Sequence, residues 1–166
     1  MYGTKSISNT DNIVDSRDVI KRISELESDR DDLQSAITDA EKEIANHVPD
    51  EDEETNLQQV DDLQTALTTA MQELEDWKTD SDGEELKDLL ALQSEGESSP
   101  DWYHGETLMH EDYFETYARQ LAEDIGAISG EEKWPLTCID WKEAAEELQQ
   151  DYTSLDFGGE TYYIPS

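Results

Sequence analysis

The chain has 166 residues, with 44 Asp and Glu against 11 Lys and Arg, which gives a formal net charge of -33. This charge excludes nucleic acid and anionic membrane surfaces as direct partners, because both repel a strongly negative protein. The mean hydropathy of -0.87, with no apolar run near the roughly 20 residues of a membrane-spanning helix, predicts a chain that does not cross a membrane.

The N-terminus and the single cysteine bear on the cellular compartment. Residues 1–8 lack the apolar core of a signal peptide, so we expect a cytoplasmic protein. One cysteine, Cys138, excludes an internal disulfide and fits a reducing compartment. Because free cysteines are usually buried, we expect Cys138 to pack in the core.

Three interpretations of the charge compete: a DNA mimic, a salt-adapted surface, and a disordered acidic chain. The 4 Trp, 7 Tyr and 2 Phe residues, together with long helical periodicity, disfavour disorder. Residues 1–100 carry a net charge of -20 and residues 101–166 one of -13. The charge therefore belongs to the whole folded surface and not to an acidic tail.

The first elements in chain order are a flexible arm over residues 1–14 and a long helix. Asp15 or Ser16 can cap this helix, and its apolar residues then recur at alternating steps of four and three, which is a heptad seam. Arg30 falls on the seam. We expect it to pair with a nearby carboxylate, and the other interpretation is a hydrophilic gap where a partner contacts the hairpin. The seam residues are Val19, Ile23, Leu26, Leu33, Ile37, Ala40 and Ile44.

A second helix follows the acidic turn over residues 50–54, with Thr55 or Asn56 as its expected cap. Two seams of similar length joined by a short turn predict an antiparallel helical hairpin, and a short third helix over residues 84–93 completes a region spanning 15–93. The second seam consists of Leu57, Val60, Leu63, Leu67, Ala70, Leu74 and Trp77.

Residues 94–101 combine Gly, Ser and Pro and predict a linker before a second domain, 102–166. In that domain we expect a helix from His110 or Glu111 to Ile125, ended by Gly126. A second helix starts at a capping box on Asp140 and runs to about residue 150. Alternating runs around Gly158–Gly159 predict a terminal β-hairpin. The fold class is thus mainly α, with a small α+β C-terminal unit. The inward face of the first of these helices comprises Tyr113, Phe114, Tyr117, Leu121 and Ile125.

No motif predicts catalysis or a bound cofactor. His47, His104 and His110 are scattered, and Cys138 has no second cysteine with which to bind zinc. The chain also lacks an EF-hand loop and a phosphate-binding glycine loop. Carboxylate pairs are too frequent to single one out as an acid–base pair. We therefore expect no metal, no cofactor and no enzymatic activity.

The charge pattern gives the sharpest hypothesis. B-DNA carries one charge per about 1.7 Å, so a rod of roughly 45 Å corresponds to about 26 charges, comparable with the -20 of the first 100 residues. Helices would hold such carboxylates at fixed spacings. The candidate partner-binding surface comprises Asp29, Asp32, Glu43, Asp61, Asp62, Glu73 and Asp76, with Glu115, Glu123, Asp124, Glu143, Glu146 and Glu147 in the last third.

A family resemblance covers about residues 110–164. The sequence from Asp112 to Ala118, followed by Leu121-Ala122 and Ile125-Gly126, resembles the Phe-Glu-x-Tyr-Ala…Gly helix of ArdA-type antirestriction proteins. The run Ile139-Asp140-Trp141, an Ala-x-x-Leu helix with Ala145 and Leu148, and the closing hairpin are similar to the final segment of that family.

The resemblance implies a DNA mimic, without catalytic residues, that occupies the DNA-binding groove of type I restriction–modification complexes. Members of the family are dimers encoded by phages, plasmids and conjugative elements, so it also implies a homodimer in a bacterial host. Residues 1–100 depart from the family, which has globular mixed domains there. The target is therefore a restriction–modification complex or another nuclease such as a CRISPR effector. The alternative hypotheses are a phage structural or adaptor protein that assembles through its coiled coil, and a salt-adapted protein of unrelated function.

Overall fold

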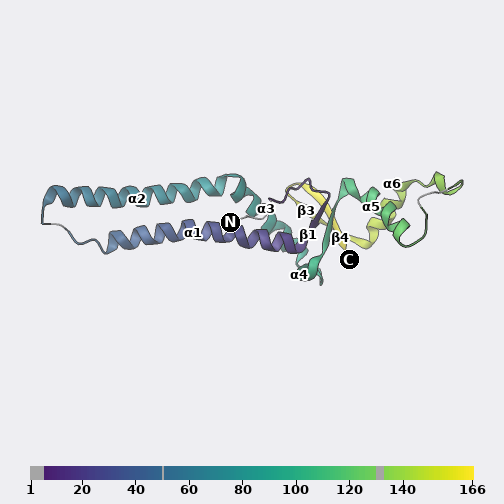
Figure 1. The fold of residues 1–166 in the computed structure, drawn as a ribbon, viewed down its shortest axis with the longest axis horizontal. Coiled ribbons are helices and arrows are strands. Elements are labelled where there is room, and N and C mark those ends of the chain that lie inside the picture. Colours follow the sequence, from purple (N-terminus) through teal and green to yellow (C-terminus); the bar gives the residue numbers. More distant parts are fainter. Residues whose placement is uncertain (1–5, 50, 130–132) are drawn as a thin grey trace. The chain divides into compact units, whose positions relative to one another are not determined.

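The computed structural model describes residues 6–49, 51–129 and 133–166 and contains long helices and a small antiparallel sheet (Figure 1). Contacts divide the chain into two compact units. We call Ile23–Lys87 the hairpin unit, and Met1–Arg22 with Asp88–Ser166 the sheet unit. The chain is mainly helical, as predicted.

The hairpin unit consists of most of α1 (Ser16–Ala45), all of α2 (Glu53–Thr79) and the start of α3 (Ser81–Gly96). In it α1 and α2 run side by side in opposite directions (Figure 1). Ile37, Ala70 and Leu74 are buried between them, with Leu33 and Leu67 packed alongside. The two predicted seams therefore meet, because apolar residues at alternating steps of three and four share one helix face. Leu57 was wrongly placed on the second seam: it is 63% exposed, because two successive steps of three, from Leu57 to Val60 to Leu63, move it off that face.

Two details of the hairpin unit refine the prediction. Arg30 reaches Asp31 at 2.8 Å and Glu27 at 3.7 Å, so its pairing with a nearby carboxylate is confirmed. The expected cap of α2 was wrong, since Asp52 is the N-cap and accepts the backbone N–H and the hydroxyl of Thr55. A carboxylate here also opposes the positive end of the helix dipole.

The described residues of the sheet unit form a four-stranded antiparallel sheet in the order β1-β2-β4-β3. Short helices and 3-10 turns surround it. The strands are β1 (Ile13–Asp15), β2 (Thr107–His110), β3 (Tyr152–Phe157) and β4 (Glu160–Pro165). The other elements are α4 (Trp102–Gly105), α5 (Glu111–Asp124), η1 (Leu136–Cys138), α6 (Trp141–Leu148) and η2 (Gln149–Asp151).

The predicted terminal hairpin is confirmed, with β3 and β4 joined by Gly158 and Gly159. Their φ angles of 57° and 86° are those of a type I′ turn, which suits glycine and matches the twist of a hairpin. Strand β2 pairs with β4, and β1 pairs with β2. The sheet is thus larger than the predicted hairpin, because distant segments add two strands to it.

One hydrophobic cluster of the sheet unit is formed by residues of the sheet and of the helices α5 and α6. Phe114 is fully buried and meets Tyr117, Tyr152 and Tyr163 with ring centroids 5.0–5.5 Å apart. Such edge-to-face pairs of aromatic rings add to the free energy gained by burial. The remaining members of this cluster are Met109, Ala118, Ala145 and Leu148.

Ser16 joins the first strand to the segment after α3. Its fully buried Oγ donates to the carbonyl of Trp102 at 2.6 Å and accepts the N–H of Glu106 at 2.7 Å. Its own N–H donates to the carbonyl of Glu106 at 2.9 Å. Of the two expected caps of α1, Asp15 supplies the contact, since its Oδ1 accepts the N–H of Arg17.

Two predicted segments differ in the structure. The predicted arm over residues 1–14 includes Ile13 and Val14, which lie in β1, and Val14 is buried; residues 1–5 fall outside the described residues. The predicted linker over residues 94–101 lies inside the sheet unit, and α3 continues to Gly96. A Cβ at Gly96 would overlap the ring of the buried Trp102, so this segment packs closely.

In the last third, α5 begins at Glu111, one of its two expected first residues, and His110 is its N-cap. Gly126 follows its end with φ 73°, and Asp140 caps α6 through two N–H groups, as predicted. Two expectations about burial were wrong. Ile125 is 71% exposed, because α5 ends at Asp124 and Ile125 is the C-cap residue that follows it. Cys138 is exposed in η1 and does not pack in the core.

Candidate functional site

The candidate surface predicted on the hairpin unit is exposed at every one of its seven residues. Their heptad positions follow from the seam, with Ile37 and Leu67 at position a. Three carboxylates of α1 and three of α2 then occupy positions c and g, which lie on one side of an antiparallel pair of helices. Asp61, at position b, projects elsewhere. The six that share a side are Asp29, Asp32 and Glu43 on α1, and Asp62, Glu73 and Asp76 on α2.

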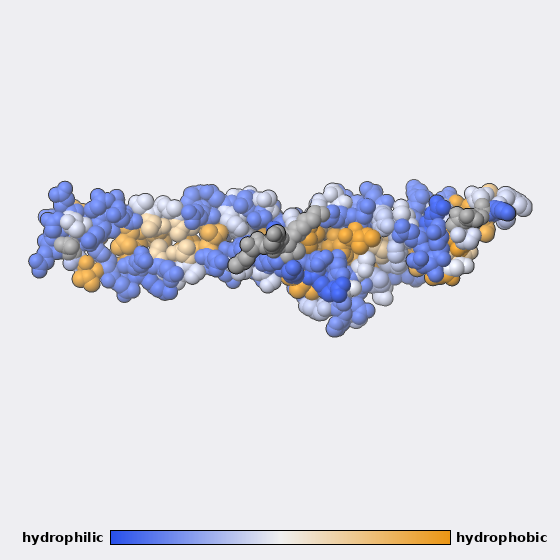
Figure 2. All heavy atoms as spheres, in the orientation of Figure 1, coloured by the Kyte–Doolittle hydropathy of each residue, from blue (hydrophilic) through white to orange (hydrophobic). Residues whose placement is uncertain are grey.

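These six residues form two rows, one along each helix, with the seam between them. We call them the carboxylate rows. Figure 2 shows an apolar band along the hairpin between hydrophilic margins. Few cations lie nearby, because the hairpin unit has 22 Asp and Glu against four Lys and Arg, a net charge of -18. All four of those cations pair with carboxylates on their own helix: Arg30 with Glu27 and Asp31, Lys42 with Asp39, Lys78 with Glu75, and Lys87 with Glu84.

In the sheet unit the six predicted carboxylates are also exposed, and the structure brings only some of them together. Glu115 of α5 and Glu146 of α6 line one groove of about 480 Å³. Lys142 lies in the same groove, with its Nζ 3.9 Å from Glu146. Glu123 pairs with Arg119 at 3.4 Å instead. The full lining of the groove is Glu111, Asp112, Glu115, Lys142, Ala145, Glu146, Gln149 and Tyr163.

Sequence reasoning missed Glu111 and Asp112 as members of this groove. Both stand in the first turn of α5, where carboxylates are expected simply to oppose the helix dipole. Their chain positions gave no sign that α6 lies opposite. The packing of α5 against α6, visible through the shared cluster of Phe114 and Ala145, places them there.

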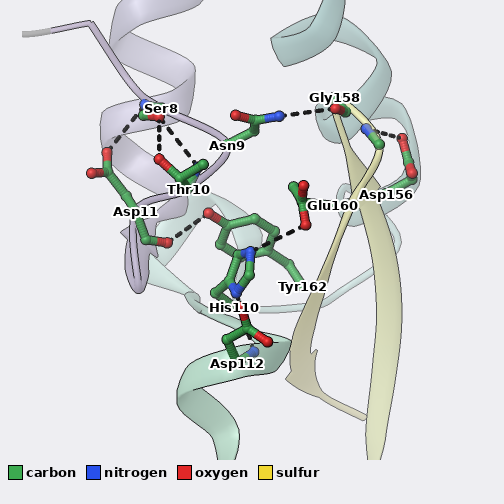
Figure 3. A network of polar contacts seen from close by, with 11 residues as sticks. Ser8, Asn9, Thr10, Asp11, His110, Asp112, Asp156, Gly158, Glu160 and Tyr162 are labelled. Atoms are coloured by element: carbon green, nitrogen blue, oxygen red, sulfur yellow. Dashed lines mark hydrogen bonds and ion pairs between the residues drawn. The ribbon is translucent and has the colours of Figure 1, made fainter.

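A polar network ties the N-terminal loop to the sheet (Figure 3). The Asn9 side chain donates to the carbonyl of Gly158 at 2.9 Å, and the Tyr162 hydroxyl donates to the carbonyl of Asp11 at 2.6 Å. Burial raises the pKa of Tyr162 to about 12, and Asp11 and Glu160 add to the shift. The network is structural, because it fixes residues 8–11 against the β3–β4 turn.

His110 lies at the centre of Figure 3 and is buried. Its Nδ1 accepts the N–H of Asp112 at 3.1 Å, which assigns the ring proton to Nε2 when the ring is neutral. Nε2 lies 3.6 Å from a carboxylate oxygen of Glu160, beyond ordinary hydrogen-bond length. The ring of Tyr162 packs edge-on against it at 5.2 Å. This histidine therefore serves as a helix cap within the core.

Two further observations concern chemistry. Within the described residues, no three His, Cys, Asp or Glu side chains are placed to hold a metal ion. A hydrogen bond from Arg17 lowers the pKa of Asp15, and hydrogen bonds from Thr55 lower the pKa of Asp52. Both are local contacts at helix starts, so the site that remains is a charged surface.

None of the described helices is both long and apolar enough to pass through a membrane. Comparisons with protein-family models, curated proteins and solved structures found no match for this chain.

Proposed function

We propose that this protein is a DNA-mimicking inhibitor of a bacterial defence nuclease. It would act in the cytoplasm of the host cell by occupying the DNA-binding cleft of a restriction–modification complex or a CRISPR effector. The protein itself would catalyse no reaction. The observation that carries the proposal is the pair of carboxylate rows on one side of the hairpin unit.

The density of charge supports this proposal. The 27 residues of α2 extend about 40 Å, a length over which B-DNA carries about 24 charges. The hairpin unit carries a net charge of -18, about three quarters of that number. A cleft that binds two phosphate backbones would meet two rows of carboxylates, and Lys or Arg side chains can pair with either.

The proposal is also supported by the fact that folded helices hold the carboxylate rows in place before any partner binds. Residues on adjoining turns of a helix keep a fixed separation, so the carboxylates need little ordering when a partner binds. A disordered polyanion would lose conformational entropy on binding the same cleft. The exposed carboxylates of the sheet unit supply a second charged surface for the same class of partner. The resemblance of residues 110–164 to ArdA-type proteins supports the choice of defence nucleases as targets.

The test is competition with DNA. Purified protein is added to a type I restriction–modification complex and to a CRISPR effector, and DNA binding and cleavage are measured for each. Inhibition should be competitive with DNA and should weaken strongly at roughly 0.5 M salt, because salt screens exposed charges. A protein that inhibits neither complex, or inhibits without displacing DNA, would exclude this proposal.

A matched pair of variants tests the carboxylate rows. The row variant carries Asp29→Asn, Glu43→Gln, Glu73→Gln and Asp76→Asn. The control variant also loses four charges of the hairpin unit, through Glu41→Gln, Glu54→Gln, Asp61→Asn and Glu75→Gln. The row variant should lose inhibition and the control should keep most of it. Equal losses would show that total charge, and not its arrangement, determines binding. Inhibition that depends on Ile23 and Leu67 but not on charge would favour the adaptor hypothesis.

A further inference from the structure

Strand β3 forms one outer edge of the sheet. The strand order β1-β2-β4-β3 places β4 on one side of it and no described strand on the other. All six residues of β3 pair one to one with β4, without a bulge. The other edge strand, β1, has only three residues. A short edge offers little backbone for pairing, whereas a regular edge of six residues is a template for another strand.

The register shows which backbone groups of β3 face its open side. Phe157 and Glu160 flank the two-residue turn, so they exchange hydrogen bonds with each other. In an antiparallel pair such residues alternate with residues whose backbone groups point away from the partner strand. The N–H and C=O groups of Tyr152, Ser154 and Asp156 therefore face the open side of β3.

Two contacts within the sheet unit agree with this assignment. The N–H of Asp156 donates to a carboxylate oxygen of Glu95 at 2.9 Å, and the N–H of Tyr152 donates to the carbonyl of Gln149. Neither group is therefore directed at β4. The N–H of Ser154, an exposed residue, and the carbonyls of Tyr152, Ser154 and Asp156 face the same side. An added antiparallel strand forms hydrogen bonds with groups of this kind.

The side chains of β3 determine which strand fits this edge. Leu155 lies on one face of the sheet, and Asp156 lies on the other face with Ser154. Residues 149–166 include three carboxylates and no Lys or Arg. An added strand therefore fits best with Lys or Arg on the face of Asp156 and with β-branched residues on the face of Leu155. The carboxylates are Asp151, Asp156 and Glu160, with Glu95 of α3 beside Asp156.

We propose that the open edge of β3 binds an extended segment of a basic partner protein, which adds a strand to the described sheet. The segment lies antiparallel to β3 and alternates Lys or Arg with β-branched residues. Its central residue exchanges two hydrogen bonds with Ser154, and the residues on either side of the centre that face β3 donate to the carbonyls of Tyr152 and Asp156.

The charge of the sheet unit favours this occupant over a second copy of the chain. The unit has 22 Asp and Glu against seven Lys and Arg, a net charge of -15. Two such units repel each other, whereas a basic segment is attracted. The inference does not rest on the proposed function, because it concerns a backbone edge of the sheet unit and not the carboxylate rows.

Matched peptides test the inference with the full-length protein. A fluorescent peptide of about seven residues, long enough to span β3, alternates Val with Lys. In one derivative the backbone nitrogens of the Lys residues are methylated, and in the other those of the Val residues. With Lys on the face of Asp156, the Lys N–H groups face β3 and the Val N–H groups face away. In fluorescence anisotropy the unmodified and Val-methylated peptides should bind, and the Lys-methylated peptide should not. Equal binding of the two derivatives would overturn the inference, because they carry the same charge.

Amide hydrogen exchange locates the contact. In the free protein the N–H of Ser154 should exchange faster than that of Leu155, which faces β4. Saturating unmodified peptide should slow exchange at Ser154 at least about tenfold and leave Leu155 nearly unchanged. Unchanged exchange at Ser154 with the peptide bound would place the peptide elsewhere and refute the inference. Protection of Ser154 that rises with protein concentration, without peptide, would identify a second copy as the occupant and would refute it equally.

A charge reversal tests the chemistry of the partner. Asp156→Lys should weaken binding of the unmodified peptide about tenfold, because a favourable cross-strand pair becomes a like-charge pair. A peptide with Glu in place of Lys should bind this variant better than it binds the wild type. The control Asp61→Lys makes the same change of charge at an exposed site of the hairpin unit and should alter affinity less than about twofold. Equal effects of the two variants would show that net charge alone attracts the peptide, contrary to the inference.

Discussion

The hairpin unit and the sheet unit carry the same number of carboxylates, 22 each, but bury very different amounts of apolar surface. Of the 21 buried hydrophobic side chains among the described residues, 15 belong to the sheet unit. In the hairpin unit the carboxylates project from two helices over a thin seam, whereas in the sheet unit they surround a layered aromatic core. High charge therefore does not determine how a region folds. In the hairpin unit the apolar contacts follow the repeat of two consecutive helices, whereas in the sheet unit they join segments that are far apart in the sequence.

The largest expected effect is in the aromatic core of the sheet unit. Phe114→Ala should cost about 3–5 kcal/mol of unfolding free energy, because it empties a fully buried site among three tyrosine rings. Urea unfolding followed by near-ultraviolet circular dichroism measures this loss. Far-ultraviolet helical signal should persist in part, since the hairpin unit has its own seam. A cost below about 1 kcal/mol would contradict the assigned core.

A smaller loss of unfolding free energy is expected when a buried side chain of the hairpin seam is truncated. Leu74→Ala removes a side chain that is 6% exposed and should cost about 2–3 kcal/mol, at the low end for core leucines because a thin seam can collapse. Thermal unfolding in the far ultraviolet measures it, with the exposed-site variant Leu57→Ala as control. If Leu74→Ala also abolished the near-ultraviolet signal of the sheet unit, the two units would unfold as one.

Ser16→Ala probes the long-range link within the sheet unit. The change removes the hydroxyl that binds Trp102 and leaves the N–H of Glu106 without its side-chain acceptor. We expect a loss of about 1–3 kcal/mol, the cost of an unsatisfied buried polar group, in urea unfolding. Ser28→Ala, at an exposed site of α1, is the matched control and should be neutral. Equal effects of the two variants would remove the assigned role of Ser16.

Alkaline pH should weaken the sheet unit. The pKa of Tyr162 is raised to about 12, and that of Tyr152 is also raised, chiefly because burial disfavours the charged phenolate. A raised folded-state pKa means that the stabilisation is complete below the ordinary pKa of 10 and is lost as pH rises toward 12. Unfolding free energy measured against pH should fall in that range. Tyr162→Phe should flatten the fall, and an unchanged profile would contradict this assignment.

The smallest effect concerns the N-cap of α2. Because Thr55 lowers the pKa of Asp52, the stabilisation is present above the ordinary pKa of 3.8 and is lost as pH falls through the lower folded value. Asp52→Asn keeps an oxygen acceptor but cannot titrate, so its helical content should vary less with acid than that of the wild type. Asp52→Ala should lower helical content at neutral pH. Far-ultraviolet circular dichroism from neutral to acid pH compares the three proteins.

The sequence alone predicted the hairpin unit well, because its contacts follow the helical repeat. Ile37 and Leu74 occupy seam positions that can be counted from the residues themselves. Arg30 also forms its ion pairs locally, with Glu27 and Asp31, which lie within one helical turn of it. The exposure of the candidate carboxylates followed in the same way, since any residue off the seam of a two-helix pair faces solvent. Their role in binding remains a prediction.

The sheet unit was predicted only where its contacts are local. The β3–β4 hairpin, the glycine that ends α5 and the Asp140 cap of α6 depend on neighbouring residues, and the sequence predicted them. Strand β1 was assigned to a flexible arm, and β2 was not predicted at all. Each is short, and each becomes a strand only by pairing with the other or with β4. The exposure of Cys138 likewise depends on what packs near it.

The amino-acid sequence by itself determined the charge, the two helical seams and the terminal hairpin, because each depends on residues a few positions apart. Only the tertiary structure decided that Ser16 would join Trp102 to Glu106, that Glu111 and Asp112 would share a groove with α6, and that β1 and β2 would complete a sheet. These features join residues as far apart in the sequence as Ile13 and Met109, which pair between β1 and β2. Such a contact forms only if the free energy gained by packing exceeds the entropy lost when the intervening chain is ordered. Neither quantity can be read from a local sequence pattern.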